Sequence, residues 1–161
     1  MKVLGIDPGY DRMGVAILEK QNSKETVLFS TCLSTNSKDD FCDRLLSLGL
    51  DLEKIIKDWK PDALSTEKLF ITTNQKTATN VAEVRGMVGY IARKAGLTVT
   101  EYTPLQIKMA VTGYGKATKN QVTDMIIKLV KLDKKIRLDD EFDAIGIALT
   151  HLACAKYNSL K

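Results

Sequence analysis

The chain has 161 residues, 44% of them hydrophobic and 27% charged, a length and a composition that suit one globular domain with a sizeable core. It contains no run of about 18 apolar residues and no basic segment leading into an apolar one, so we predict neither a membrane span nor a secretory signal. Three cysteines without C-x-x-C spacing (Cys32, Cys42 and Cys154) predict free thiols in a reducing cytoplasm.

The net charge of +4 is distributed unevenly along the chain. Residues 103–137 hold eight Lys or Arg and only two Asp, whereas residues 138–161 hold two Lys and four acids. A basic segment followed by an acidic cluster suits a polyanionic partner and metal-assisted chemistry. It equally suits a lysine-rich helix face in water, so charge alone leaves both interpretations open.

The first part of the chain predicts three strands, over residues 2–7, 13–19 and 26–33. Each is rich in strand-forming residues, and Pro8 and Gly9 end the first one. The gaps between them are short, which favours an antiparallel meander.

The period then changes to that of a helix over residues 41–59, with apolar residues on one face. Asp39 or Asp40 can cap this helix, and Lys60 with Pro61 ends it. Residues 63–67 form the next expected strand. A helix between two strands allows a crossover, so this strand can lie parallel to the first.

Helix and strand then repeat, with a helix over residues 75–94 and a strand over 97–101. Three further helices are expected over residues 104–111, 119–132 and 140–157. The whole order predicts an α/β fold with a five-stranded mixed sheet, three antiparallel strands and then two parallel ones, flanked by helices.

A stripe of small residues runs along the helix over 75–94: Ala78, Ala82, Gly86 and Gly89. Such a stripe allows another backbone to come close. It therefore predicts either packing on the sheet or a contact between two copies of the chain.

Four acidic residues are expected at one edge of the sheet. Asp7 ends the first strand and Glu67 ends the fourth, so parallel pairing would place both at the carboxyl edge, where open α/β sheets carry their sites. Asp140 and Asp143 begin the last helix three positions apart and therefore share a face. Acids in a first helical turn also favour the helix dipole, which is the plainer explanation for these two.

Four converging carboxylates would repel one another and raise their pKa values unless a cation lay among them. Hard oxygen ligands without cysteine suit Mg²⁺ or Mn²⁺. Two such ions can activate a water and stabilise the leaving oxygen of a phosphodiester. The spacing therefore predicts a metal-dependent nuclease site, with capping and surface acids as the alternative.

Five motifs, in order and over nearly the whole chain, closely resemble the RuvC family of Holliday-junction resolvases. They are GIDPG followed by Gly14, TEKLF at 66–70, NVAEVRG at 80–86, TPLQIKMAVTGYGKATKNQV at 103–122 and DDEFDAIGIALTH at 139–151.

The resemblance implies a single ribonuclease H-like nuclease domain over residues 1–161 and a cytoplasmic homodimer. It implies a Mg²⁺-dependent endonuclease, with two ions per site and Mn²⁺ as a substitute. Such an enzyme cuts two opposed strands of a four-way DNA junction and leaves ligatable 5′-phosphate and 3′-hydroxyl ends. The catalytic and metal-binding acids carried over by motif are Asp7, Glu67, Asp140 and Asp143. A branch-migration motor is a further possible partner.

The DNA-contacting positions carried over are Phe70, Lys108 and Lys119. Phe70 would stack on a base, and the two lysines would contact phosphates. The residues alone also allow Phe70 in the core and both lysines on an ordinary surface. His151, the one histidine, is expected to be a satisfied, partly buried side chain.

The chain departs from the family at Tyr10 and Asp11, where many members have a Ser-Arg-x-Thr-Gly run. Asp11 would add a negative charge near the site. This departure affects the expected DNA contacts around residues 10 and 11, and it does not affect the assignment of the four acids as metal ligands.

Other functions remain as rivals. A YqgF-type nuclease on the same fold would act on RNA, and an idle junction-binding protein would lack cleavage. A sugar-kinase or actin-like ATPase would be far longer. The GYGKAT segment fails as a phosphate-binding loop because Ala110 stands where a glycine is required, so no nucleotide cofactor is expected.

Overall fold

A computed structural model describes residues 1–22, 24–68, 75–132 and 138–158 of the chain. The strands are β1 (Lys2–Asp7), β2 (Arg12–Gln21), β3 (Lys24–Ser34), β4 (Ala63–Glu67), β5 (Thr98–Tyr102) and β6 (Val130–Lys131). The helices are α1 (Phe41–Trp59), α2 (Gln75–Lys94), α3 (Pro104–Thr112), α4 (Lys119–Leu129) and α5 (Asp139–Asn158). No helix among the described residues has the length and apolar character needed to cross a bilayer.

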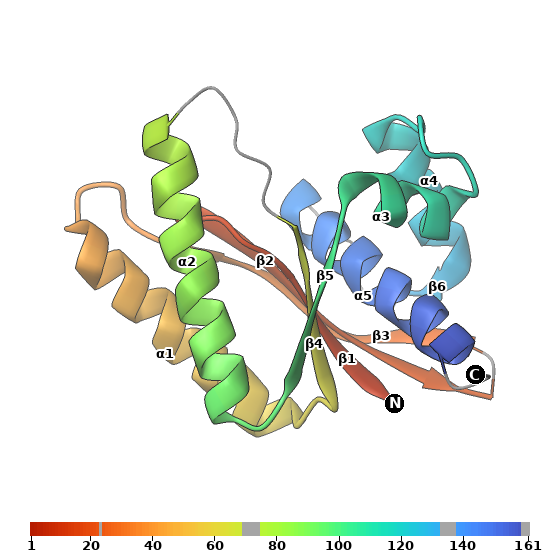
Figure 1. The fold of residues 1–161 in the computed structure, drawn as a ribbon, viewed down its shortest axis with the longest axis horizontal. Coiled ribbons are helices and arrows are strands. Elements are labelled where there is room, and N and C mark those ends of the chain that lie inside the picture. The colour runs from red at the N-terminus through yellow and green to blue at the C-terminus, as the bar shows by residue number, and fades with distance from the viewer. Residues whose placement is uncertain (23, 69–74, 133–137, 159–161) are drawn as a thin grey trace.

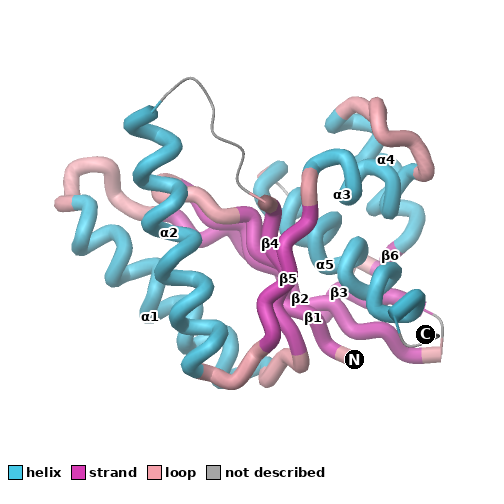
Figure 2. Tube along the Cα trace, viewed as in Figure 1, coloured by secondary structure: helices cyan, strands magenta, loops and turns pink. Residues whose placement is uncertain are grey.

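The strands form one mixed sheet in the order β5-β4-β1-β2-β3-β6. β1, β2 and β3 pair antiparallel, while β4 pairs parallel with β1 and β5 parallel with β4. Helices α1 and α2 cover one face, and α5 with α3 and α4 lies on the other (Figures 1 and 2). The expected α/β fold with a mixed sheet and flanking helices is confirmed.

The expected number of five strands is wrong, because the sheet has six. The expected helix over 119–132 ends at Leu129, and Val130 and Lys131 pair with Glu25 and Thr26 of β3. Periodic apolar residues continue past the helix end, so the pattern does not mark this boundary. Burying the β-branched Val130 against the sheet favours the extended conformation there.

Helix α1 begins as its sequence predicts. The Asp40 carboxylate accepts a hydrogen bond from the Cys42 amide at 2.9 Å, which satisfies one of the free donors of the first turn. Lys60 adopts a left-handed conformation (φ 47°) and its amide bonds to the Ile56 carbonyl, closing the helix before Pro61.

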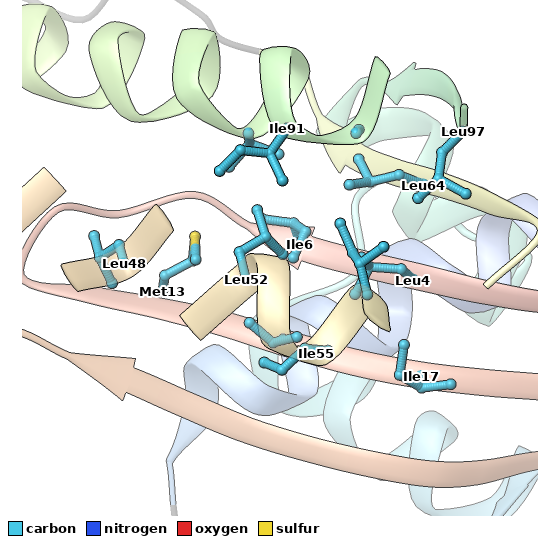
Figure 3. Close-up of a cluster of buried hydrophobic side chains, with 14 of the residues drawn as sticks. Leu4, Ile6, Met13, Ile17, Leu48, Leu52, Ile55, Leu64, Ile91 and Leu97 are labelled. Carbon is cyan, nitrogen blue, oxygen red and sulfur yellow. The ribbon is translucent and has the colours of Figure 1, made fainter. Parts of the chain in front are cut away.

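The sheet separates two apolar cores. Leu4, Ile6 and Met13 point toward α1 and α2, where they meet side chains such as Leu52 and Ile91 (Figure 3). Alternate residues, including Val3, Ala16 and Leu18, point to the other face and pack against α5. Burial on both faces fixes the strand register, because a shift by one residue would exchange the two sets.

Helix α5 lies very close to β1 and β2, and two glycines allow this. A Cβ on Gly5 would stand 2.2 Å from the Ala144 carbonyl oxygen, and one on Gly14 would stand 2.0 Å from that of Asp140. The two glycines therefore set the distance of α5, which carries Asp140, from the strand that carries Asp7.

Two glycines of the small-residue stripe on α2 do not pack on the sheet. A Cβ on Gly86 or on Gly89 would meet no heavy atom of the described chain within 4 Å. Packing of these two glycines on the sheet is therefore not found among the described residues, and a contact with a second copy of the chain stays a prediction.

We predict that Gly5→Ala lowers the free energy of unfolding by about 2–3 kcal/mol, because the added methyl group forces α5 away from β1. Gly86→Ala, where the space is open and the residue is helical, should leave stability unchanged or raise it by up to about 1 kcal/mol. Urea denaturation of both variants measures this difference. Equal stability of the two would contradict the close approach of α5.

Candidate active site

Asp7 and Glu67 lie side by side at the carboxyl edge of the sheet. Ile6 and Thr66, the residues just before them, are register partners in the parallel pair of β1 and β4. Asp7 itself pairs with Gly14 of β2, and the Asp140 backbone packs directly on Gly14. The first turn of α5 thus begins where β1 ends, which brings Asp140 and Asp143 to the same edge.

The electrostatics of Asp7 reflect this grouping. Burial, followed by the negative charges of Asp143, Glu67 and Asp140, raises the pKa of Asp7 to about 7, and the positive charge of Lys119 opposes this shift. Burial, followed by the charge of Asp143, also raises the pKa of Glu67, while Lys119 and Lys108 oppose that shift. The four acids therefore form one interacting cluster, which we call the acid cluster.

Two basic side chains lie against the acid cluster. Lys119 at the start of α4 donates hydrogen bonds to Asp143 Oδ2 and to Asp139 Oδ2, both at 2.8 Å. Burial disfavours the charged form of Lys119, but these two hydrogen bonds raise its pKa above the ordinary value. Arg12 Nε lies 3.4 Å from Asp140 Oδ2.

The donor set of the acid cluster fits a divalent cation. It consists of carboxylate oxygens, and Asp140 Oδ2 is buried with no hydrogen bond from any described residue beyond its ion pair with Arg12. Among the residues that the structure describes, no three acid, histidine or cysteine side chains are drawn together tightly enough to form a ligand set. Asp143 Oδ2 is instead paired with Lys119.

Three further residues singled out in the sequence are Lys108, Phe70 and His151. Lys108 on α3 lies close enough to affect the pKa of Glu67. Phe70 lies outside the described residues. His151 is buried, and its Nδ1 lies 3.1 Å from the Tyr102 hydroxyl, so it is a satisfied histidine as expected.

Sequence reasoning missed Arg12, Asp139 and Cys32. Arg12 and Cys32 flank Asp140, and burial followed by the Asp140 charge raises the pKa of the Cys32 thiol to about 11. The strand register explains the place of Cys32, since Gly14 pairs with both Asp7 and Cys32. The contacts of Arg12 and Asp139 have no such signal in the sequence. Asp11 does not add an uncompensated charge, because its carboxylate pairs with Arg44.

Comparison with known proteins identifies the family of this chain. The family model for "Crossover junction endodeoxyribonuclease RuvC" matches residues 3–151. The crossover junction endodeoxyribonuclease RuvC of Halothermothrix orenii is 41% identical over 94% of this chain and 92% of its own length. The crossover junction endodeoxyribonuclease RuvC of Caldanaerobacter subterraneus is 40% identical over 100% of this chain and 96% of its own length.

Solved structures give the same result. Thermus thermophilus RuvC in complex with a Holliday junction substrate superposes with a TM-score of 0.93 at 28% identity, covering 99% of this chain and 97% of that one. The yeast mitochondrial Holliday junction resolvase Ydc2 shares the fold, with a TM-score of 0.72 at 15% identity over 98% of this chain and 82% of its own. With its family model, its relatives and its fold in agreement, this chain belongs to the RuvC family of crossover junction endodeoxyribonucleases.

Proposed function

We propose that this protein is an endodeoxyribonuclease that resolves four-way DNA junctions in recombination and repair. The observation that carries the proposal is the acid cluster at the carboxyl edge, in a chain whose relatives are crossover junction endodeoxyribonucleases and whose solved relative was bound to a Holliday junction. We propose further that residues 1–161 act as one nuclease domain.

Asp7, Glu67, Asp140 and Asp143 are the residues that would hold the metal, which we propose to be two Mg²⁺ ions, with Mn²⁺ as a substitute. When bound, such ions lower the pKa of water and stabilise charge on the departing 3′ oxygen, which leaves 5′-phosphate and 3′-hydroxyl ends. The pKa values of Asp7 and Glu67, raised by burial and then by repulsion among the acids, support this assignment, because a bound cation would favour the charged carboxylates.

The basic residues beside the cluster would position the DNA. Lys119 and Lys108 place positive charge next to the acids, and phosphate oxygens are the ligands such charges attract. Base stacking by Phe70 remains a prediction about the loop after β4.

A homodimer fits a substrate with two-fold symmetry, because each subunit can reach one of two opposed strands. An apolar groove of about 360 Å³ lies between α1 and α2, lined by residues including Leu46, Leu50 and Tyr90. These three side chains are 57–68% exposed, so the groove offers a surface that a second copy would bury. A branch-migration motor as partner and a cytoplasmic location stay predictions.

We predict that Asp7→Asn abolishes cleavage of a synthetic four-way junction in Mg²⁺, with a rate loss of at least about 1,000-fold, because the cluster loses a charged ligand. Binding of the junction should survive, since the lysines and the protein surface are unchanged. End-labelled strands, resolved after the reaction, show whether the wild-type cuts are paired and symmetric.

Linear duplex and an RNA stem-loop serve as controls for this experiment. Cleavage of the RNA alone would favour the YqgF-type alternative. Tight junction binding without cuts in Mg²⁺ or Mn²⁺ would favour an idle binding protein.

The raised pKa of Asp7 predicts a pH dependence of stability in the metal-free protein. Folded Asp7 keeps its proton up to about pH 7, whereas the unfolded chain releases it near 3.8, so stability falls as the pH rises between these values. Asp7→Asn should therefore stabilise the protein by roughly 1–3 kcal/mol at pH 8 and by little at pH 4. Denaturation in EDTA at both pH values measures this. An equal effect at the two pH values would rule out a raised pKa.

Leu50→Glu should weaken the proposed dimer, because it places a charge in the apolar groove. Light scattering should then report a monomer, and junction cleavage should change from paired cuts to single nicks. An exposed-site change outside the groove, Ile127→Glu on α4, is the matched control. A dimer that persists in Leu50→Glu would show that the interface lies elsewhere.

A further inference from the structure

An arginine of helix α1, Arg44, is buried beneath the turn that follows Asp7. Its side chain is only 10% exposed, although arginine is among the residues least often buried. A guanidinium out of water is costly unless its donors are satisfied, and a nonpolar side chain of similar size would avoid that cost. Arg44 therefore needs an explanation beyond packing.

The guanidinium of Arg44 binds the turn through its backbone. Arg44 Nη2 donates to the Tyr10 carbonyl at 3.0 Å, and Arg44 Nε donates to Thr35 Oγ1 at 2.8 Å. The Thr35 hydroxyl donates in turn to the same Tyr10 carbonyl at 2.7 Å, and the Thr35 amide donates to the Asp11 carbonyl at 3.1 Å. The turn is thus fixed from both α1 and the end of β3.

Side-chain contacts complete the arrangement. Arg44 also pairs with the Asp11 carboxylate, and its guanidinium lies 5.1 Å from the centre of the Tyr10 ring. The Tyr10 ring makes an edge contact with Phe41, at 6.2 Å between ring centres. Because the Asp11 side chain is 63% exposed, its ion pair with Arg44 contributes little compared with the bonds to the backbone.

Both ends of this turn reach the acid cluster. Asp7 precedes it on β1, and Arg12, which lies beside Asp140, follows it on β2. Gly9 within the turn has no room for a side chain, since a Cβ there would stand 2.2 Å from the Arg12 carbonyl oxygen. A displacement of the turn would therefore move Asp7 relative to Asp140.

We propose that Arg44 is a positioning residue, which holds the turn of residues 8–11 so that Asp7 keeps its place opposite Asp140. The proposal rests on the proposed nuclease function. The rigid fork of the guanidinium performs this task by bridging the Tyr10 carbonyl and the Thr35 hydroxyl, and its positive charge is secondary.

The test compares Arg44→Gln with wild type in three measurements on the full chain. These are the single-turnover rate of junction cleavage at saturating protein, the Kd for the junction without metal, and the Kd for Mn²⁺ from electron paramagnetic resonance. We expect the cleavage rate to fall by about 10- to 100-fold, because small misplacements at a reacting centre have effects of this size. The junction Kd should stay within about threefold and the Mn²⁺ Kd should rise about tenfold.

Three further variants separate geometry from charge and from folding. Arg44→Lys keeps the charge but not the fork, so it should recover only part of the rate. Asp11→Asn removes the ion pair and should stay within about threefold of wild type. Arg93→Gln is the matched control, because Arg93 also donates to a backbone carbonyl, that of Leu97, but away from the acid cluster.

The outcomes are distinct. A folded Arg44→Gln with wild-type cleavage and Mn²⁺ affinity would overturn the proposal, as would full recovery in Arg44→Lys or an equal loss in Asp11→Asn. If Arg44→Gln does not fold, Thr35→Val removes the bridging hydroxyl and should show the same losses. If wild type cuts no junction, the proposed function fails, and the Mn²⁺ affinities still decide the role of Arg44.

Discussion

Repulsion among carboxylates at one sheet edge is the constraint on which this structure depends. The parallel pairing of β1 with β4 forces Asp7 and Glu67 together, and the close approach of α5 adds Asp140 and Asp143. Burial and then the charges of the other three acids raise the pKa of Asp7 to about 7, so the charged form of Asp7 is disfavoured in the folded protein. The metal-free protein relieves the repulsion by protonation and by pairing with Lys119, which leaves a site prepared for a stronger cation.

The surroundings of the acid cluster serve its geometry. Gly5 and Gly14 lack side chains so that α5 can lie against the strands, and both faces of the sheet are buried so that the register cannot slip. Two strand positions, Gly5 and Gly14, thus contribute no side chain to the core, and this allows α5 to bring Asp140 and Asp143 to the sheet edge. The proposed anchoring of the turn by Arg44 is a third device of the same kind, acting from α1.

Much of this was accessible from the sequence because it follows from local patterns. The elements from β1 through α1 were predicted from strand alternation, from the change to a helical period at Phe41 and from an aspartate cap at residue 39 or 40. The ends of two strands predicted where Asp7 and Glu67 meet. The pairing of β6 with β3 was not accessible. Val130 joins β3 across about 100 residues of chain, and a two-residue strand has no pattern of its own.

The residues of the site also differ in how well the sequence predicts them. The four acids lie at the ends of strands or at the start of a helix, and such ends can be predicted from local patterns. Their basic partners come from other elements, Lys119 from α4 and Arg12 from β2. Arg44 lies within a helix whose period predicts only burial, so its contacts with Tyr10 and Thr35 have no signal in the sequence. Such side-chain contacts between elements require the coordinates.

A crystal structure with Mn²⁺, in which anomalous scattering locates the ions, tests the metal site directly. We predict manganese bound by Asp7 together with Glu67, Asp140 or Asp143, and Asp143 no longer paired with Lys119. Manganese absent from the carboxyl edge, or bound there without Asp7, would contradict the claim that the acid cluster is the metal-dependent catalytic centre.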